Sequence, residues 1–176
     1  MALDVDGVLN ALSDESARPV REVHIPAAAL PDSPFVRRPE GDVLTVRLRL
    51  DGSDAVWIGR LREKADVVWA TTWEHLANTV IAAELGIDPL EVAVTAEGYP
   101  PRFGDIRNGD SGAWKLEALA ERYQRRHVVF VDDSVWHAPA TGCYSMVVTP
   151  DGRFGLGRGL RGRVTRFVNR YSPSAD

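Results

Sequence analysis

Apolar residues are arranged along the chain in two alternating patterns. Short, nearly continuous apolar runs, typical of strands covered on both faces, lie at residues 2–5, 66–71, 91–95, 127–131 and 145–149. Stretches in which apolar residues recur every three or four positions predict helices at residues 73–85, 111–125 and 160–170. This alternation predicts an α/β fold, in which a mainly parallel sheet is covered by helices on both faces.

The residues after the first run depart from this alternation. Five prolines interrupt residues 10–40, so the pattern predicts only a helical turn there, at Ala27–Leu30. Residues 43–50 alternate between apolar and polar side chains, which predicts a half-buried strand with one wet face.

Two alternatives remain for the residues that follow this strand. One is a hairpin return along residues 55–58. The other is a helix over residues 54–65 that begins at a cap formed by Ser53 or Asp54. The helix is favoured because its last residues are good helix formers.

Length and composition place limits on the class of protein. The 176 residues predict one domain, 1–176, with room for a hydrophobic core, and 44% of the residues are hydrophobic. The formal net charge of −4 does not favour nucleic-acid or membrane binding by the chain as a whole. The N-terminus lacks a positively charged signal region, and no apolar run approaches the ~20 residues of a membrane helix. We therefore expect a soluble, cytoplasmic protein without a membrane partner.

Two acidic residues, Asp4 and Asp6, stand directly after the first apolar run. Side chains at positions i and i+2 of a strand point the same way, so both carboxylates could face one small volume. Two such charges repel each other unless a cation shares the space, and Mg²⁺ suits carboxylate oxygens. The alternative at this point is a solvated Asp-x-Asp-Gly turn.

Further polar residues follow the other predicted elements of the sheet. Thr71 ends the second apolar run, Asp132 and Asp133 end the fourth, and Lys115 belongs to the helix before it. Sites in parallel α/β folds lie beyond the carboxyl ends of the strands. The sequence therefore predicts that four carboxylates, a hydroxyl and an amine meet at one edge of the sheet.

This set of motifs resembles the haloacid dehalogenase (HAD) superfamily of phosphatases. The four matching parts are Asp4-Val5-Asp6-Gly7-Val8, Val67-Val68-Trp69-Ala70-Thr71, Lys115, and Val128-Val129-Phe130-Val131-Asp132-Asp133. The resemblance covers residues 1 to about 150 and implies a three-layer, Rossmann-like fold. More narrowly, residues 68–78 are similar to small bacterial HAD domains, some of which belong to RNA-repair proteins.

The resemblance also implies roles for the acidic residues. Asp4 would be the nucleophile and would pass through an aspartyl-phosphate. Asp6 would act as general acid and then general base, and its backbone carbonyl would be a metal ligand. Mg²⁺, the expected cofactor, would lie between Asp4 and Asp132. Asp133 would hold either the metal's waters or Lys115.

The remaining implied contacts involve the phosphate and the substrate. Thr71 and Lys115 would bind the non-bridging phosphoryl oxygens, with Thr72 as the residue that competes for the role of Thr71. Arg102 and Arg107 lie in a loop rich in glycine and proline, where they could contact a phosphate or an anionic substrate tail.

Each of these assignments has a structural alternative. Thr71 could only cap the following helix, because Thr71 to Glu74 fit a capping-box pattern. Lys115 could be a solvated helix lysine, and the Asp132–Asp133 pair could be an exposed strand end. The C-terminal arginines could simply face water rather than bind an anionic partner; they are Arg153, Arg158, Arg161, Arg163, Arg166 and Arg170.

By the same resemblance, residues 10–65 would form a small cap or β-flap inserted after the first strand, because the segment is short and rich in proline. The expected function is Mg²⁺-dependent hydrolysis of phosphate monoesters, with a phosphorylated small molecule as substrate. One alternative is a polynucleotide-end phosphatase, whose partner is a nucleic-acid end. Another is a non-catalytic or receiver-like phosphate-binding domain, although receivers place their acceptor aspartate and lysine in a different order.

Overall fold

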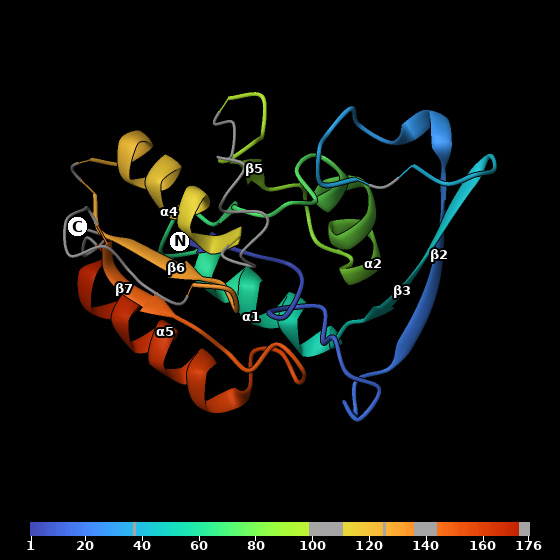
Figure 1. Ribbon diagram of the computed structural model, residues 1–176. Helices are drawn as coiled ribbons and strands as arrows, with labels where there is room; N and C mark the ends of the chain where they lie inside the picture. The colour runs from blue at the N-terminus through green and yellow to red at the C-terminus, as the bar shows by residue number, and fades with distance from the viewer. Residues whose placement is uncertain (37, 99–110, 125, 136–143, 173–176) are drawn as a thin grey trace.

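The computed structural model describes residues 1–36, 38–98, 111–124, 126–135 and 144–172 (Figure 1). At its centre is a five-stranded sheet in the order β5-β4-β1-β6-β7, in which every neighbouring pair is parallel. The strands are β1 (Ala2–Leu3), β4 (Val68–Trp69), β5 (Glu91–Val92), β6 (Val128–Val131) and β7 (Tyr144–Val148). The predicted α/β fold with a mainly parallel sheet is confirmed, and each strand overlaps one of the predicted apolar runs.

The central strand β1 ends earlier than its apolar run because a side chain replaces the neighbouring strand as hydrogen-bond partner. The Asp4 N–H still donates to the Val131 carbonyl of β6 at 2.9 Å. The next N–H, that of Val5, donates instead to Asp4 Oδ1 at 2.8 Å. The chain therefore leaves the sheet at Asp4, which stands at the carboxyl end of the central strand.

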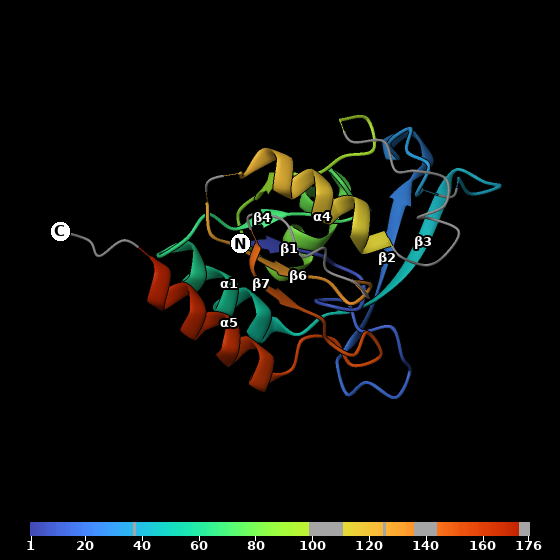
Figure 2. The same ribbon diagram turned by 60° about the vertical axis from the view of Figure 1, so that its left-hand side comes forward.

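Helices cover both faces of the sheet (Figure 2). On one face lie α1 (Gly52–Arg62) and α5 (Arg158–Tyr171), whose Ile58 and Val164 belong to the same buried cluster as Leu3. On the other face lies α4 (Ser111–Arg122), whose Leu119 is buried in a cluster with Phe130. The predicted helices at 111–125 and 160–170 are thus confirmed. No helix in the described part of the chain is long and apolar enough to cross a membrane.

The helical alternative for residues 54–65 is confirmed by α1, but its predicted cap is wrong. Asp51 caps the helix, because its carboxylate accepts a hydrogen bond from the Ser53 N–H at 2.9 Å. Asp54 lies one turn further along and is completely buried. The sequence alone does not distinguish Asp51, just before the helix, from Asp54, just inside it; the two differ in burial.

The predicted helix over residues 73–85 is irregular. It consists of turns followed by a π-helix, η2 (Ala77–Ala82), and a short α-helix, α2 (Ala83–Leu85), which ends as expected at the left-handed Gly86. The late start follows from Glu74, whose φ of 49° is incompatible with a helix. The Glu74 side chain is buried and accepts a hydrogen bond from the Ala96 N–H at 2.7 Å.

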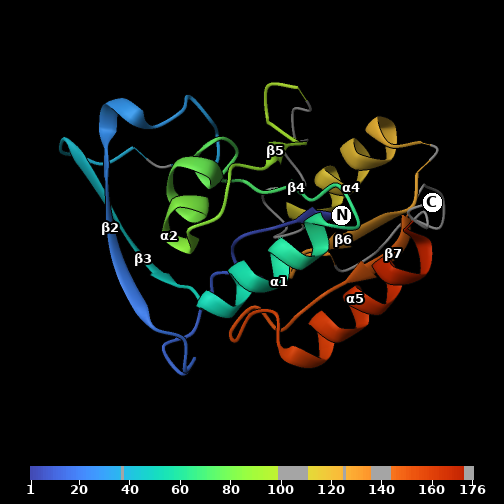
Figure 3. The ribbon, with the colours of Figure 1, turned by 180° about the vertical axis from the view of Figure 1, so that it is seen from behind.

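A separate two-stranded antiparallel sheet follows β1 in sequence, which we call the β2–β3 ribbon: β2 (Val20–Pro26) pairs with β3 (Val43–Arg49). Figure 3 shows it at the side of the molecule, beside α2 and away from α5. The strand at 43–50 and the turn near Ala27 were predicted, and a 3-10 turn covers Ala27–Ala29. Strand β2 was not predicted, because prolines flank it and most of its residues are exposed.

Candidate active site

A buried lysine joins two aspartates at the carboxyl edge of the sheet. Asp4 follows β1, Asp132 follows the neighbouring strand β6, and Lys115 reaches them from α4. The Lys115 Nζ lies 2.7 Å from Asp4 Oδ2 and 2.5 Å from Asp132 Oδ2. Lys115 and Asp132 are completely buried, and Asp4 is 5% exposed. The structure therefore brings three predicted site residues together and excludes a solvated Lys115.

Burial and ion pairing act on these three groups in opposite directions. Burial raises the pKa of the Asp4 carboxyl above its ordinary value, although the Lys115 ammonium opposes this effect. Burial also favours neutral Asp132, but Lys115 and hydrogen bonds from Ser134 hold the pKa of that carboxyl below its ordinary value. Burial alone would lower the pKa of Lys115, yet the two carboxylates raise it. Lys115 is therefore a permanent positive charge at neutral pH.

Asp133 completes a group of three acids. Oxygen atoms of Asp4, Asp132 and Asp133 all lie within 4.8 Å of one another. The Asp133 carboxylate fits against Gly7 and Gly152, where any Cβ atom would overlap it. Burial, together with the charge of Asp132, raises the pKa of Asp133 to about 6. Three carboxylates against one ammonium leave an excess of negative charge, and hard oxygen ligands of this kind fit Mg²⁺.

The Asp6 carboxylate has other partners. Its Oδ1 accepts a hydrogen bond from Asn10 Nδ2 at 2.7 Å, and its Oδ2 accepts one from Trp73 Nε1 at 2.8 Å. Both Asp4 and Asp6 lie beyond β1, which ends at Leu3, so the alternation of side chains along a strand does not set their directions. Asp6 nevertheless lies close enough for its charge to favour the protonated form of Asp4.

The two threonines after β4 occupy different surroundings. Thr71 is completely buried, and its Oγ1 accepts a hydrogen bond from the Trp73 N–H at 3.3 Å. The predicted capping box does not form, because the Glu74 carboxylate bonds the Ala96 N–H instead. Thr72 is half-buried and lines a cavity that Asp6 and Trp73 also line. Thr71 thus stands beside the central strand, whereas Thr72 faces the cavity. Arg102 and Arg107 lie outside the described residues.

These contacts define the site closely enough to compare it with known proteins. No family model, curated protein or solved structure matches this chain.

Three residues that sequence reasoning did not assign support the acids. Asn10 and Trp73 fix the orientation of the Asp6 carboxylate. The Ser134 N–H and Oγ donate to Asp132 Oδ1 at 2.8 and 2.6 Å. The spacing of Asp132 and Ser134 is that of an Asx-turn, so this partner could have been found from sequence. Nothing in the sequence links Trp73 to Asp6.

A buried ion-pair network holds the loop that follows Asp6. Asp54 Oδ2 lies 3.0 Å from Arg18 Nη1, and Asp54 Oδ1 lies 2.5 Å from Arg161 Nη2. Arg18 also donates to the Leu9 carbonyl, and both arginines donate to the Leu156 carbonyl. The network ties this loop to α1 and α5. The alternative that the C-terminal arginines simply face water therefore does not hold for Arg161, whose side chain is largely buried.

Proposed function

We propose that the protein is a Mg²⁺-dependent phosphatase of the HAD type, which hydrolyses phosphate monoesters through an aspartyl-phosphate on Asp4. The observation that carries this proposal is Lys115, held without solvent exposure between Asp4 and Asp132. Burying a lysine and two aspartates costs desolvation energy, which their mutual attraction often fails to offset. Clusters of this kind are therefore found more often at functional sites than at purely structural positions. The ribbon β2–β3 would be the minimal cap of this enzyme.

The acidic group fits a divalent cation. Asp4, Asp132 and Asp133 would hold Mg²⁺ through carboxylate oxygens, with the Asp6 carbonyl as a further ligand by resemblance to the family. When bound, Mg²⁺ would neutralise charge and polarise the phosphoryl oxygens. The proposal predicts that these ligands must be deprotonated to bind the metal.

The chain's own residues would perform two displacements. In the first, an Asp4 carboxylate oxygen forms a bond to phosphorus while the bond to the leaving oxygen breaks, and Asp6 gives that oxygen a proton. In the second, Asp6 takes a proton from a water molecule, whose oxygen attacks phosphorus and releases Asp4. Lys115 and Thr71 would stabilise the negative charge on the non-bridging oxygens.

The geometry of Asp4 and Asp6 is consistent with these roles. The Val5 N–H and the Lys115 ammonium each contact one Asp4 oxygen, which fixes the rotation of the carboxylate. Asn10 and Trp73 fix Asp6 in the same way. A nucleophile and an acid–base group held by packed neighbours need little rearrangement when substrate binds.

We expect hydrolysis of p-nitrophenyl phosphate to require Mg²⁺ and to be abolished by EDTA. Because the pKa of Asp133 is raised to about 6, its protonation opposes metal binding below that pH. The Mg²⁺ concentration that gives half-maximal activity should therefore be higher at pH 5 than at pH 7.5. Titrating activity with Mg²⁺ at both pH values measures this.

The matched variants for this experiment are Asp133→Asn and Asp88→Asn. Asp88 is an exposed acid outside the site, so its variant should behave as the wild type. Asp133→Asn should raise the half-maximal Mg²⁺ concentration by about tenfold or more at pH 7.5. Full activity in EDTA, or an Asp133→Asn variant with unchanged metal dependence, would contradict the proposed metal site.

A further inference from the structure

A cavity of about 200 Å³ lies between the β2–β3 ribbon and the residues that precede η2. Its apolar walls include Leu44 and Val46 of β3, and Phe35 and Val36 of the segment that connects β2 to β3. Trp73 lines the opposite side. The volume is that of a small ligand, since a cavity of about 150 Å³ is enough to hold a benzene molecule.

The cavity reaches the acid–base group of the proposed reaction. Asp6 lines it, and the Trp73 ring that lines it also donates its N–H to Asp6 Oδ2 at 2.8 Å. In the proposed mechanism Asp6 protonates the leaving oxygen, so the leaving group must lie next to Asp6. The cavity is the space next to Asp6 that could hold this leaving group.

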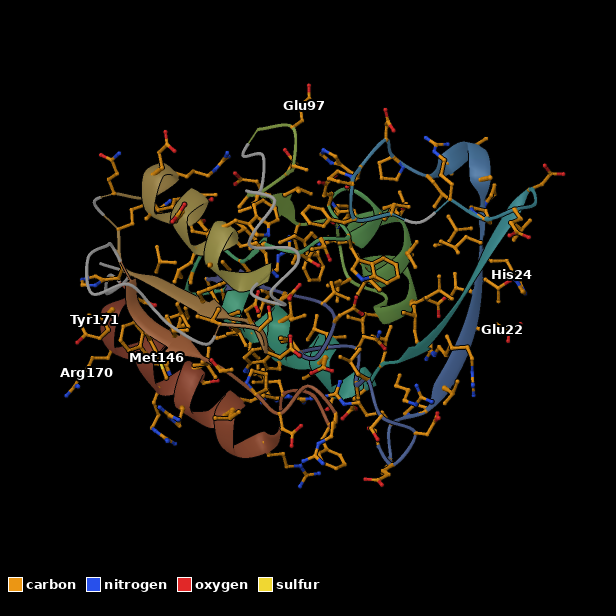
Figure 4. All side chains as sticks on the ribbon, viewed as in Figure 1. Glu22, His24, Glu97, Met146, Arg170 and Tyr171 are labelled. Carbon is orange, nitrogen blue, oxygen red and sulfur yellow. The ribbon has the colours of Figure 1, made fainter. Side chains whose placement is uncertain are left out.

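The residues that line the cavity disfavour a charged leaving group. Among the described residues that line the cavity, Asp6 is the only one with a charged side chain. Glu22 and His24 of β2 are exposed and project away from the body of the protein (Figure 4). The guanidinium of Arg21, the other charged residue of β2, pairs with Glu84. A second anionic group in the leaving group would meet no counter-charge among the described residues of these walls and would be repelled by Asp6.

The ribbon's register explains this division. Val23 pairs with Val46 and Ile25 pairs with Leu44, and these four residues are more buried than their neighbours. Successive side chains of a strand point to opposite faces, so these four apolar residues share one face of the ribbon, and Ile25, Leu44 and Val46 of that face line the cavity. On the other face, the exposed residues include Glu22, His24, Val43, Thr45 and Arg47.

We propose that this cavity is the leaving-group subsite and that the substrate is a phosphate monoester of an uncharged, largely apolar alcohol about the size of one ring. This inference rests on the proposed phosphatase function. It predicts discrimination against substrates with a second phosphate or a carboxylate in the leaving group, including sugar bisphosphates.

The test compares phenyl phosphate with 4-carboxyphenyl phosphate, which has a leaving group of similar size and acidity but carries an added charge. We expect kcat/KM to favour phenyl phosphate by about 10- to 100-fold. Acetyl phosphate, which places no ring in the cavity, serves as the reference for the chemistry of Asp4.

Two variants of the same strand provide a matched pair. Leu44→Lys adds a cation to the cavity and should improve kcat/KM for 4-carboxyphenyl phosphate, relative to phenyl phosphate, by about tenfold or more. Thr45→Lys adds the same charge to the exposed face and should leave the ratio unchanged. If Leu44→Lys does not fold, Val46→Thr replaces it and should lower kcat/KM for phenyl phosphate severalfold without changing that for acetyl phosphate.

The outcomes separate the two proposals. If acetyl phosphate is hydrolysed but the two aryl phosphates react equally and neither cavity variant changes their ratio, the subsite is wrong and the phosphatase remains. If none of the three compounds is hydrolysed, the proposed function itself fails. Preference for a 3′-phosphorylated oligonucleotide, with turnover that falls steeply as salt increases, would overturn the subsite in favour of a nucleic-acid end.

Discussion

Replacing Asp4 with asparagine is expected to lower kcat for phosphate-ester hydrolysis by about 10⁴-fold or more, because removal of a nucleophile removes the covalent route. The amide has nearly the same shape as the carboxylate and can still accept the hydrogen bond from the Val5 N–H. Lys115 keeps its ion pair with Asp132. The loss should therefore reflect chemistry rather than unfolding.

The measurement is steady-state kinetics at saturating Mg²⁺, with the thermal unfolding of each variant recorded alongside. Asp88→Asn, which removes an exposed carboxylate, is the control and should retain wild-type kcat. An Asp4→Asn variant that keeps more than about a tenth of wild-type kcat would exclude Asp4 as the nucleophile.

The second large effect is expected from Lys115→Met, which should lower the free energy of unfolding by about 3–5 kcal/mol at pH 7. Methionine fills similar space but leaves the Asp4 and Asp132 carboxylates buried without their counter-charge. The same variant should lose most phosphatase activity, because Lys115 would no longer bind the phosphoryl group.

The pH dependence of the lost free energy of unfolding distinguishes an effect of charge from an effect of packing. Lys115 holds the pKa of Asp132 below its ordinary value, so in the wild type this stabilisation is still present at pH 4. In Lys115→Met the effect of burial, which raises the pKa of Asp132, is no longer opposed by the ammonium, so the buried carboxyl takes up a proton as the pH falls and the uncompensated charge disappears. The difference between Lys115→Met and the wild type should therefore shrink from pH 7 towards pH 4. Denaturant unfolding at both pH values measures it.

The chain contains one other lysine, Lys64, which is exposed and follows α1, so Lys64→Met is the matched control. We expect that control to change the free energy of unfolding by less than about 0.5 kcal/mol. Mg²⁺ should raise the melting temperature of Lys115→Met more than that of the wild type, because the cation supplies the missing charge. A Lys115→Met variant as stable as the wild type at pH 7 would contradict the buried ion-pair assignment.

The sheet could be predicted because its strands are buried on both faces and therefore appear as continuous apolar runs. The placement of Asp4, Asp132 and Lys115 followed from the same pattern, since all three belong to elements whose carboxyl or amino ends meet at one edge. In contrast, β2 is largely exposed and flanked by proline, so neither apolar content nor periodicity marks it.

Contacts between distant segments account for most of what the sequence did not reveal. Arg18 and Asp54 are 36 positions apart, and Trp73 and Asp6 are 67 positions apart. Each pair forms only because the fold places its segments together. Asp6 differs for a local reason: β1 ends at Leu3, so the alternation of side chains along a strand does not extend to this residue.

The central claim is that Asp4 carries the phosphoryl group, and the most direct test is to trap it there. The protein would be mixed with p-nitrophenyl phosphate and Mg²⁺, quenched in acid during turnover, and reduced with borohydride, which converts an aspartyl-phosphate to homoserine. Peptide mass spectrometry should then find homoserine at position 4, dependent on substrate and absent from Asp4→Asn. Turnover with no modification at position 4, or with the modification at another aspartate, would contradict the account.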